Sequence, residues 1–275
     1  MNKISVVLCA KNEEDRIADS LKSILKNKID EVIIVDGNSS DKTIEIAKNF
    51  DCKIIQSKSG SLTYDRQLGI NNAKKFNDIA MIDADHVLKE NDIELLYLDL
   101  QKYNLDIVQS QFKTYENRSF LSIAEDQLYF IQHNKPGIKK MIGTAPAIYK
   151  RKIFNYIKFD SNITKKIDDT DFMYRLSKLK KYKVGVGDTV IMQNHIPKLK
   201  HFINKYIGYG YGDGEFVFKY PKKIFGILYN LIFWYLLAYP LKSIIFLKFM
   251  AAPLFFFQGF LRIVGMSKYF LNKKN

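Results

Sequence analysis

The segment Ile79-Ala80-Met81-Ile82-Asp83-Ala84-Asp85 decides the fold class of this 275-residue chain. Its apolar run is typical of a buried strand. The two acids that follow the run then emerge at the carboxyl end of the strand, where open α/β sheets bind their ligands. Two carboxylates one residue apart can hold a hard divalent cation, either Mg²⁺ or Mn²⁺, and an acidic turn without a metal is the alternative.

Strand and helix patterns alternate around this segment. Apolar or β-branched runs predict strands, and helical spacing of apolar residues predicts helices. The predicted strands are 4–10, 31–36, 53–56 and 79–83, and the predicted helices are 15–25, 42–50 and 64–75. This alternation indicates a doubly wound α/β domain with a mostly parallel sheet.

The pattern becomes mixed after residue 105. We expect a strand at 107–114, helices at 120–132 and 168–179, and strand structure at 184–195 that is interrupted at Gly187-Asp188. Short strands next to helices are compatible with the same α/β domain.

A second acid, Asp36, ends the predicted strand 31–36 in the same way as Asp83 ends its own strand. The polar cluster 38–41 favours the N-cap of the next helix, but Asp36 lies before that turn. Two acids at the carboxyl ends of separate strands indicate a shared pocket.

Positive charge gathers in the last eighty residues. From Ile196 onward, twelve Lys and Arg stand against Asp213 and Glu215, so this part holds ten of the fourteen net positive charges. The longest apolar runs lie in the same part. Basic charge beside apolar, aromatic sequence indicates an anionic membrane surface. Nucleic acid is not an expected partner, because its binding sites interleave aromatics with Lys and Arg on a polar surface.

Two apolar blocks lie near the end of the chain. Residues 224–241 form a run of 18 without a charge, and residues 249–261 form a second block behind Lys242 and Lys248. A helix that spans a bilayer needs about 20 apolar residues. These blocks are compatible with a spanning hairpin, with helices in the membrane plane or with a buried pair of packing helices. Of these, we expect membrane association.

The two cysteines, Cys9 and Cys52, fit neither a zinc spacing nor a disulfide framework. They favour a reducing, cytoplasmic compartment. The first residues enter a strand pattern directly, so we expect no signal peptide. The expected location is the cell membrane, with the catalytic part on the cytoplasmic side.

Four segments together resemble family 2 glycosyltransferases. They are VVLCAKNEE at 6–14, IIVDGNSSDKT at 33–43, YDRQLGINNA at 64–73 and IAMIDADH at 79–86, in the family's order over the first ninety residues or so. The resemblance implies a GT-A fold, a nucleotide-diphosphate-sugar donor and inversion at the anomeric carbon.

The resemblance also implies roles for individual residues. Glu13 and Asp36 would contact the nucleoside, and Arg66 would lie near the base or diphosphate. Asp83 would face the ribose or sugar, and Asp85 would bind the metal. For Arg66 the alternative is a solvated charge on a helix.

A weaker similarity lies at Asp168-Asp169-Thr170-Asp171, which begins a predicted helix. It resembles the family's acidic pair, and this alignment makes Asp169 the catalytic base that accepts the proton of an acceptor hydroxyl. The family's pair is usually Glu-Asp, so the register stays open by one residue. The alternative is that the acids only favour a helix N-terminus through its dipole.

Two later residues receive roles from the same resemblance. His195 ends a predicted strand where some relatives contact the metal or diphosphate, and a structural histidine is the alternative. Lys205 lies in FINKYIGYGYGDG at 202–214, which resembles the segment that closes the family's acceptor side. It would meet phosphate, unless this segment is only an interfacial helix.

The sequence therefore predicts an inverting, metal-assisted glycosyltransferase with an Asp base. The expected acceptor lies at the membrane and is a lipid-linked glycan, a lipid or a polyprenyl phosphate. The expected division is a catalytic domain at 1–195, a basic-aromatic interfacial segment at 196–223 and membrane-associated helices at 224–275.

Two other functions are weighed against this one. A nucleotidyltransferase would favour a Gly-rich, basic phosphate loop after the first strand, and the sequence has CAKNEEDR there. A non-catalytic, membrane-anchored binding module would not be expected to retain the acids at 36, 83, 85 and 169.

Overall fold

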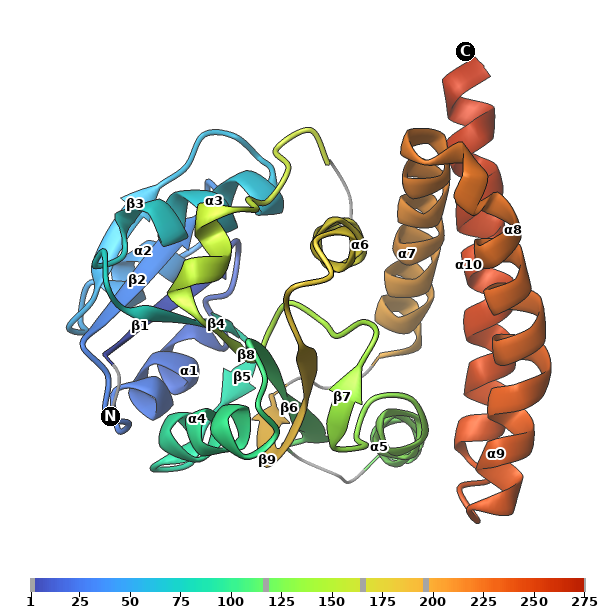
Figure 1. Cartoon of the computed structure of the whole chain (residues 1–275), viewed down its shortest axis with the longest axis horizontal. Coiled ribbons are helices and arrows are strands. Elements are labelled where there is room, and N and C mark those ends of the chain that lie inside the picture. The colour runs from blue at the N-terminus through green and yellow to red at the C-terminus, as the bar shows by residue number, and fades with distance from the viewer. Residues whose placement is uncertain (1–2, 116–118, 164–166, 195–197, 275) are drawn as a thin grey trace. The chain divides into compact units, whose positions relative to one another are not determined.

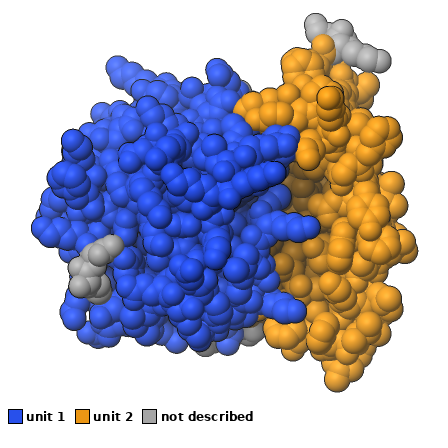
Figure 2. Space-filling model, in the orientation of Figure 1, with its two compact units in different colours: residues 1–115, 135–164, 168–194 blue, residues 116–134, 165–167, 195–275 orange. Residues whose placement is uncertain are grey.

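The computed structural model describes residues 3–115, 119–163, 167–194 and 198–274 (Figure 1). The chain forms two compact units, which are coloured separately in Figure 2. The first unit comprises residues 1–115, 135–164 and 168–194, and the second comprises residues 116–134, 165–167 and 195–275.

A mixed sheet forms the centre of the first unit. Its strand order is β3-β2-β1-β4-β8-β6-β9-β5, and β7 pairs with β9. The strands are β1 Ile4–Ala10, β2 Glu31–Asp36, β3 Lys53–Gln56, β4 Asp78–Asp83, β5 His86–Val87, β6 Ile107–Thr114, β7 Gly137–Lys139, β8 Ala147–Tyr149 and β9 Val184–Gln193.

Parallel pairing joins β1 to β2 and β4, β2 to β3, and β6 to β9. The pairs that involve β5, β7 and β8 are antiparallel. The mostly parallel sheet that the sequence predicts is therefore confirmed. The predicted interruption at Gly187-Asp188 coincides with a shift in the β6–β9 register, where Gln109 faces Val186 but Gln111 faces Val190.

Helices cover both faces of this sheet. They are α1 Ile17–Ile24, α2 Thr43–Ala47, α3 Leu62–Asn72, α4 Asp92–Lys102 and α6 Asp168–Lys178, with a short 3-10 helix η1 at Arg151–Asn155. Helices α1, α3 and α6 lie within a few residues of their predicted positions, and α2 is shorter than the predicted 42–50. The sequence patterns did not predict α4 or η1.

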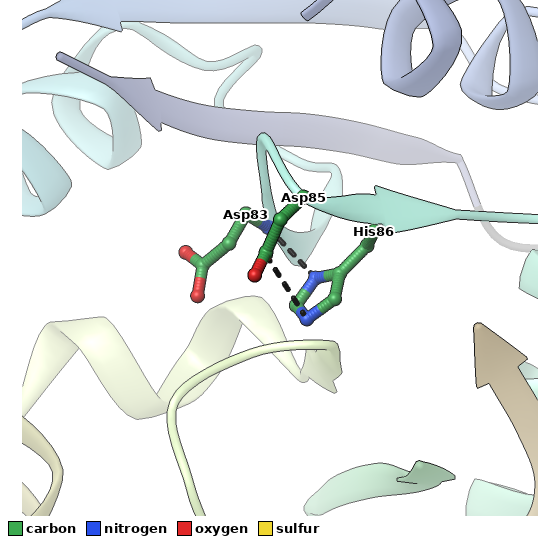
Figure 3. Close-up of side chains that lie close together, drawn as sticks. All are labelled: Asp83, Asp85 and His86. Atoms are coloured by element: carbon green, nitrogen blue, oxygen red, sulfur yellow. Dashed lines mark hydrogen bonds and ion pairs between the residues drawn. The ribbon is translucent and has the colours of Figure 1, made fainter. Parts of the chain in front are cut away.

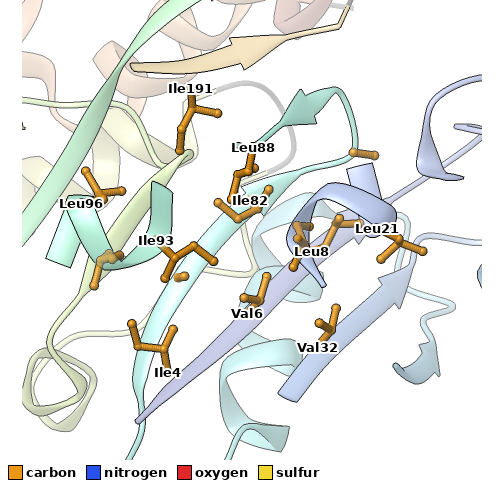
Figure 4. Packing of buried hydrophobic residues seen from close by; sticks show 14 of the residues in the cluster. Ile4, Val6, Leu8, Leu21, Val32, Ile82, Leu88, Ile93, Leu96 and Ile191 are labelled. Atoms are coloured by element: carbon orange, nitrogen blue, oxygen red, sulfur yellow. The ribbon is translucent and has the colours of Figure 1, made fainter. Parts of the chain in front are cut away.

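Two hydrophobic clusters lie on opposite faces of the sheet. Val6 and Leu8 of β1 belong to the cluster that includes Leu21 of α1 and Leu96 of α4 (Figure 4). Val7 belongs to the other cluster, with residues of α3 and α6. Successive side chains of a strand point to opposite faces, so a sheet that is covered on both faces needs apolar residues at every position. This explains why the strands appear in the sequence as continuous apolar runs.

Helix α3 lies unusually close to the sheet at Gly69. A methyl group on Gly69 would come within 2.4 Å of Val7 Cγ1 and 3.2 Å of Val35 Cγ2. The glycine therefore allows the helix to rest directly on β1 and β2. Arg66 lies three residues earlier and shares this face of the helix, so the close contact also sets the position of its side chain.

We expect Gly69→Ala to lower the free energy of unfolding by about 1–3 kcal/mol, because an added methyl group in a packed core forces its neighbours apart. The better helix propensity of Ala recovers at most about 1 kcal/mol. Urea unfolding monitored by circular dichroism measures the difference. Asn71→Ala, an exposed position on the same helix, is the matched control and should change stability by about 0.5 kcal/mol or less. A Gly69→Ala protein as stable as this control would contradict the packing argument.

The described part of the second unit is helical. Its helices are α5 Phe120–Gln132, α7 Leu199–Lys219, the 3-10 helix η2 Pro221–Lys223, α8 Ile224–Tyr229, the π-helix η3 Asn230–Ala238, α9 Tyr239–Ile245 and α10 Ala251–Lys274. The helix predicted at 120–132 is confirmed.

Elements η2 to α9 run on as one helix, Pro221–Ile245, which we term the apolar helix. Its 25 residues include an 18-residue window with a mean hydropathy of 1.6, and only 11% of that window is buried. Among the described residues, this helix meets the length and composition that crossing a membrane requires. Its low burial argues against the alternative of a buried packing helix for this block.

Helices α7 and α10 pack at very short range within the second unit. A methyl group on Gly210 would lie 2.0 Å from the carbonyl oxygen of Arg262, and one on Gly265 would lie 2.1 Å from that of Ile207. Arg262 also donates from Nε and Nη2 to the buried carboxylate of Asp213, at 2.8 and 2.7 Å. Small residues and a two-point ion pair therefore hold these two helices together.

Candidate active site

Three side chains with metal-binding atoms lie at the end of β4. Asp83 is the last residue of the strand, and Asp85 and His86 follow at the turn into β5 (Figure 3). Each offers one ligand atom, and these atoms all lie within 4.8 Å of one another. The carboxylate oxygens of Asp83 and Asp85 are hard donors that suit Mg²⁺ or Mn²⁺.

The parallel register places Asp36 at the same edge of the sheet. In the middle strand β1, Cys9 is paired with Asp83 of β4, and Ala10 is paired with Asp36 of β2. The two acids therefore flank the end of one strand, as their positions in the sequence predict.

The carboxylate of Asp36 also holds its own turn together. It is buried and accepts hydrogen bonds from the backbone N–H of Ser39, at 3.2 Å, and from Ser39 Oγ, at 2.5 Å. Asp41, in contrast, accepts from the backbone N–H of Thr43, at 3.0 Å, where α2 begins. The N-cap position of α2 is Lys42, which makes no side-chain cap hydrogen bond. Within the 38–41 cluster, Asp41 binds the first N–H of the helix from one residue earlier, and Asp36 fixes the loop before it.

The loop that carries Glu13 is bound to this same turn. The backbone N–H of Glu13 donates to Thr43 Oγ1 at 2.8 Å, and that of Ser40 donates to Asn12 Oδ1 at 2.8 Å. The Glu13 carboxylate forms an ion pair with Arg16. Burial raises the pKa of Glu13 although Arg16 acts to lower it. The loops after β1 and β2 therefore form one hydrogen-bonded wall.

Arg66 of α3 lies between two carboxylates. Its Nη2 donates to Asp83 Oδ1 at 3.2 Å, and its Nη1 forms an ion pair with Asp168 Oδ2. Only 5% of Arg66 is exposed, which excludes a solvated helix charge. Burial alone would lower the pKa of Arg66, but the Asp83 carboxylate outweighs it and raises the pKa above its ordinary value.

The three acids at the start of α6 differ in their surroundings. Asp168 is buried and accepts from Thr144 Oγ1 at 2.9 Å in addition to pairing with Arg66. Asp171 is 1% exposed and accepts from Arg175 Nε at 2.7 Å. Asp169 is half-buried, so its carboxylate is the most accessible of the three to solvent.

Two predicted site residues do not belong to the described part of the first unit. His195 falls outside the described residues. Lys205 lies on α7 in the second unit, with its Nζ 6.0 Å from the ring centre of Tyr129 and 5.7 Å from that of Tyr206. Burial alone would lower the pKa of Lys205, but the neighbouring tyrosines raise it well above its ordinary value.

Two residues next to Asp85 were not predicted from the sequence as site residues. His86 appears only as the last letter of the motif IAMIDADH, and Gln193 lies in no motif. In the structure, Gln193 Nε2 donates to Asp85 Oδ2 at 2.8 Å. Only the pairing of β5 with β9, which sets His86 opposite Gln193, brings them together. No local pattern in the sequence reveals a pairing between segments so far apart.

Comparison with known proteins agrees with this geometry. The sequence model described as glycosyl transferase family 2 matches residues 5–158. An uncharacterized glycosyltransferase of Rickettsia felis is 27% identical over 288 residues, which cover 100% of this chain and 93% of the relative. The cholesterol galactosyltransferase of Borreliella burgdorferi is 30% identical over 167 residues, which cover 55% of this chain and 45% of the relative.

Solved structures show the same fold. The chain is similar to S. aureus TarS 1-349 in complex with UDP-GlcNAc, with a TM-score of 0.55 and 17% identity over 76% of this chain and 66% of that one. The same protein in complex with UDP matches over 99% of this chain and 91% of that one, with a TM-score of 0.53 and 15% identity.

The family match covers more than half of the 275 residues, and the fold is the one that the resemblance implies. The predicted family, fold class and enzyme class are therefore confirmed. This chain is a glycosyltransferase and belongs to glycosyl transferase family 2.

Proposed function

We propose that this chain transfers a sugar from a nucleotide-diphosphate donor, with the aid of Mg²⁺ or Mn²⁺, to a hydroxyl group of an acceptor at the membrane surface. One observation carries the donor half of the proposal. The carboxylates of Asp83 and Asp85 lie together at the carboxyl edge of the sheet, and a buried arginine fixes one of them. Acids in this arrangement suit a cation that binds a diphosphate.

The donor occupies the edge formed by β1, β2 and β4 in this proposal. Glu13 and Asp36 line its nucleoside end, since the loops that carry them form one wall. Asp83 faces the ribose or sugar, and Asp85 holds the cation. The cation, when bound, neutralises the charge that develops on the departing diphosphate. Because TarS has been solved with UDP-GlcNAc, UDP-sugars are the first donors to test.

Arg66 supports the donor site through its buried ion pair with Asp83. With 5% of its surface exposed, it orients Asp83 and adds positive charge to the diphosphate side of the pocket. His195 and Lys205 stay candidate contacts to the metal and to phosphate, respectively. Lys205 is suited to phosphate because a protonated amine attracts phosphate oxygens.

Asp169 acts as the base. The acceptor oxygen attacks the anomeric carbon while its proton passes to the Asp169 carboxylate, and the bond to the diphosphate oxygen breaks with its electron pair on that oxygen. Attack opposite to the leaving group inverts the anomeric carbon. Asp168 and Asp171 are buried, whereas Asp169 is half-buried, and this greater exposure supports Asp169 for the role.

A base is needed for a hydroxyl acceptor but not for a phosphate acceptor, which is already ionised. Asp169 therefore favours a lipid or a lipid-linked glycan over a polyprenyl phosphate. The similarity to a cholesterol galactosyltransferase also supports a lipid-type acceptor, over 55% of this chain.

The second unit supports a location at the cytoplasmic face of the cell membrane. The apolar helix and α10 present large apolar side chains to solvent, and cations lie at the ends of the helix. The exposed apolar residues include Phe225, Tyr229, Ile232, Phe233, Leu237, Leu241, Ile244, Ile245, Phe256, Phe257 and Phe260. Lys222 and Lys223 lie at one end of the apolar helix and Lys242 near the other. Apolar surface flanked by cations suits an anionic bilayer, whether the helix spans it or lies in its plane.

We expect Asp85→Asn to lower kcat/KM for sugar transfer at least a hundredfold, because the cation loses a charged ligand. The assay measures nucleotide diphosphate released from a panel of nucleotide sugars, with and without Mn²⁺ or Mg²⁺, in the presence of membrane lipid extract. Asp51→Asn, an exposed acid, is the control and should leave the rate unchanged. Full activity of Asp85→Asn, or full activity without any divalent cation, would contradict the metal assignment.

We expect Asp169→Asn to lower kcat by a factor of about 100 to 10,000, the usual contribution of general base catalysis, while donor affinity stays within about threefold. Single-turnover rates and calorimetric titration with the donor separate these two quantities. Asp171→Asn is the matched variant: loss of its pair with Arg175 should lower the melting temperature more than kcat. If Asp171→Asn lowers kcat strongly and Asp169→Asn does not, the assignment of the base to Asp169 is wrong.

Membrane attachment is tested by flotation of the chain with vesicles of phosphatidylglycerol and phosphatidylcholine. We expect wild type to float with the vesicles. The triple variant Phe225→Ser/Leu237→Ser/Leu241→Ser should float less, because it removes apolar area from the exposed face of the apolar helix.

The control for flotation lies in the first unit. Phe76, Leu95 and Leu98 are exposed by 86, 48 and 52%, and their replacement by serine should leave flotation unchanged. Equal loss of flotation in both triple variants, or none in either, would argue against the apolar helix as the membrane-binding element.

A further inference from the structure

The turn after β4 contains a histidine whose two ring nitrogens face different partners. His86 is 2% exposed and begins β5, which pairs in antiparallel fashion with β9. Its Nδ1 accepts a hydrogen bond from the backbone N–H of Asp83 at 3.0 Å. Its Nε2 lies 3.7 Å from Asp85 Oδ1. Dashed lines in Figure 3 mark both contacts.

The bond at Nδ1 restricts what the other nitrogen can do. An acceptor nitrogen must be unprotonated, so the neutral ring carries its proton on Nε2. A metal ligand needs a lone pair on the coordinating nitrogen. In this tautomer the Nδ1 lone pair is engaged with Asp83 N–H, and the protonated Nε2 lies 3.7 Å from Asp85 Oδ1, beyond direct hydrogen-bond distance. His86 is therefore close to the acids, but it is not arranged as a ligand.

The second oxygen of Asp85 has a donor of its own. Gln193, which faces His86 across the β5–β9 pair, donates from Nε2 to Asp85 Oδ2 at 2.8 Å. The next residue, Asn194, donates its backbone N–H to the carbonyl oxygen of Asp85 at 2.6 Å. Both the side chain and the backbone of Asp85 are thus tied to the end of β9.

We propose that Gln193 and His86 are positioning residues for the divalent cation site. Gln193 holds the Asp85 carboxylate in the orientation that binds the cation, and His86 holds the backbone of the turn through the N–H of Asp83. The cation is then coordinated by the carboxylates and not by His86. Donors that orient a ligating carboxylate strengthen metal binding without touching the metal. This inference rests on the proposed function, since it concerns the same cation site.

Pulsed electron paramagnetic resonance of the full-length chain with Mn²⁺ and UDP tests the ligand question directly. A histidine nitrogen bound to Mn²⁺ produces a strong ¹⁴N coupling. We expect the ¹⁴N signal of His86→Gln to equal that of wild type, because His86 is not a ligand. A ¹⁴N coupling that is present in wild type and lost in His86→Gln would overturn the assignment. A coupling that both proteins retain comes from another residue.

Metal affinity tests the positioning role. We expect His86→Ala and Gln193→Leu each to weaken Mn²⁺ binding about ten- to a hundredfold, as loss of a partner of a metal ligand usually does. His86→Asn keeps an acceptor for Asp83 N–H, so it should recover part of the Mn²⁺ affinity that His86→Ala loses. Titration with Mn²⁺ at saturating UDP gives Kd, and thermal unfolding without metal confirms that each variant is folded.

Two controls match these substitutions. His201→Ala and Gln56→Leu remove the same kinds of side chain from exposed positions, and they should leave Kd for Mn²⁺ unchanged. If wild type binds Mn²⁺ and folded His86→Ala and Gln193→Leu bind it equally well, the positioning role is wrong while the proposed function stands. If wild type fails to bind Mn²⁺ with UDP, the cation half of the proposed function fails as well.

Discussion

The ion pairs of Arg66 with Asp83 and Asp168 are the interaction on which the site depends. They join α3, β4 and α6, which lie far apart in the sequence. A charge that is buried without a partner is very unfavourable, so each of these elements is held where the arginine can be satisfied. The close approach of α3 to β1 at Gly69 determines how far the Arg66 side chain extends toward Asp83. Packing and electrostatics therefore specify the same arrangement.

The first half of the fold could be predicted because its physical signals are local. Strands buried on both faces give continuous apolar runs, and β1, β2 and β4 lie where those runs predict. Strands β7 and β8, with three residues each, are too short to show a period, so the antiparallel part of the sheet was not predicted. The acids at the ends of β2 and β4 were found for the same local reason. The burial of Arg66 and the bond from Gln193 to Asp85 depend on contacts between distant segments, which no local pattern encodes.

The second unit shows what apolar composition alone can and cannot establish. Composition correctly indicates helices, and the uncharged run lies in the mostly exposed apolar helix. It does not reveal that α10 is bound to α7 through close glycine contacts and the pair of Arg262 with Asp213. These contacts are specific and polar, so average hydropathy does not register them. The second apolar block therefore belongs to a helix with an internal partner as well as an exposed side.

The pairing of one guanidinium with two acids has a consequence for charge at the edge of the sheet. Asp83, Asp85 and Asp168 bring three negative charges when ionised, and Arg66 offsets one of them. The edge therefore stays anionic and repels an incoming diphosphate until a cation binds. Arg66 reduces this repulsion but does not remove it, so the order of binding favours the cation before the donor or together with it.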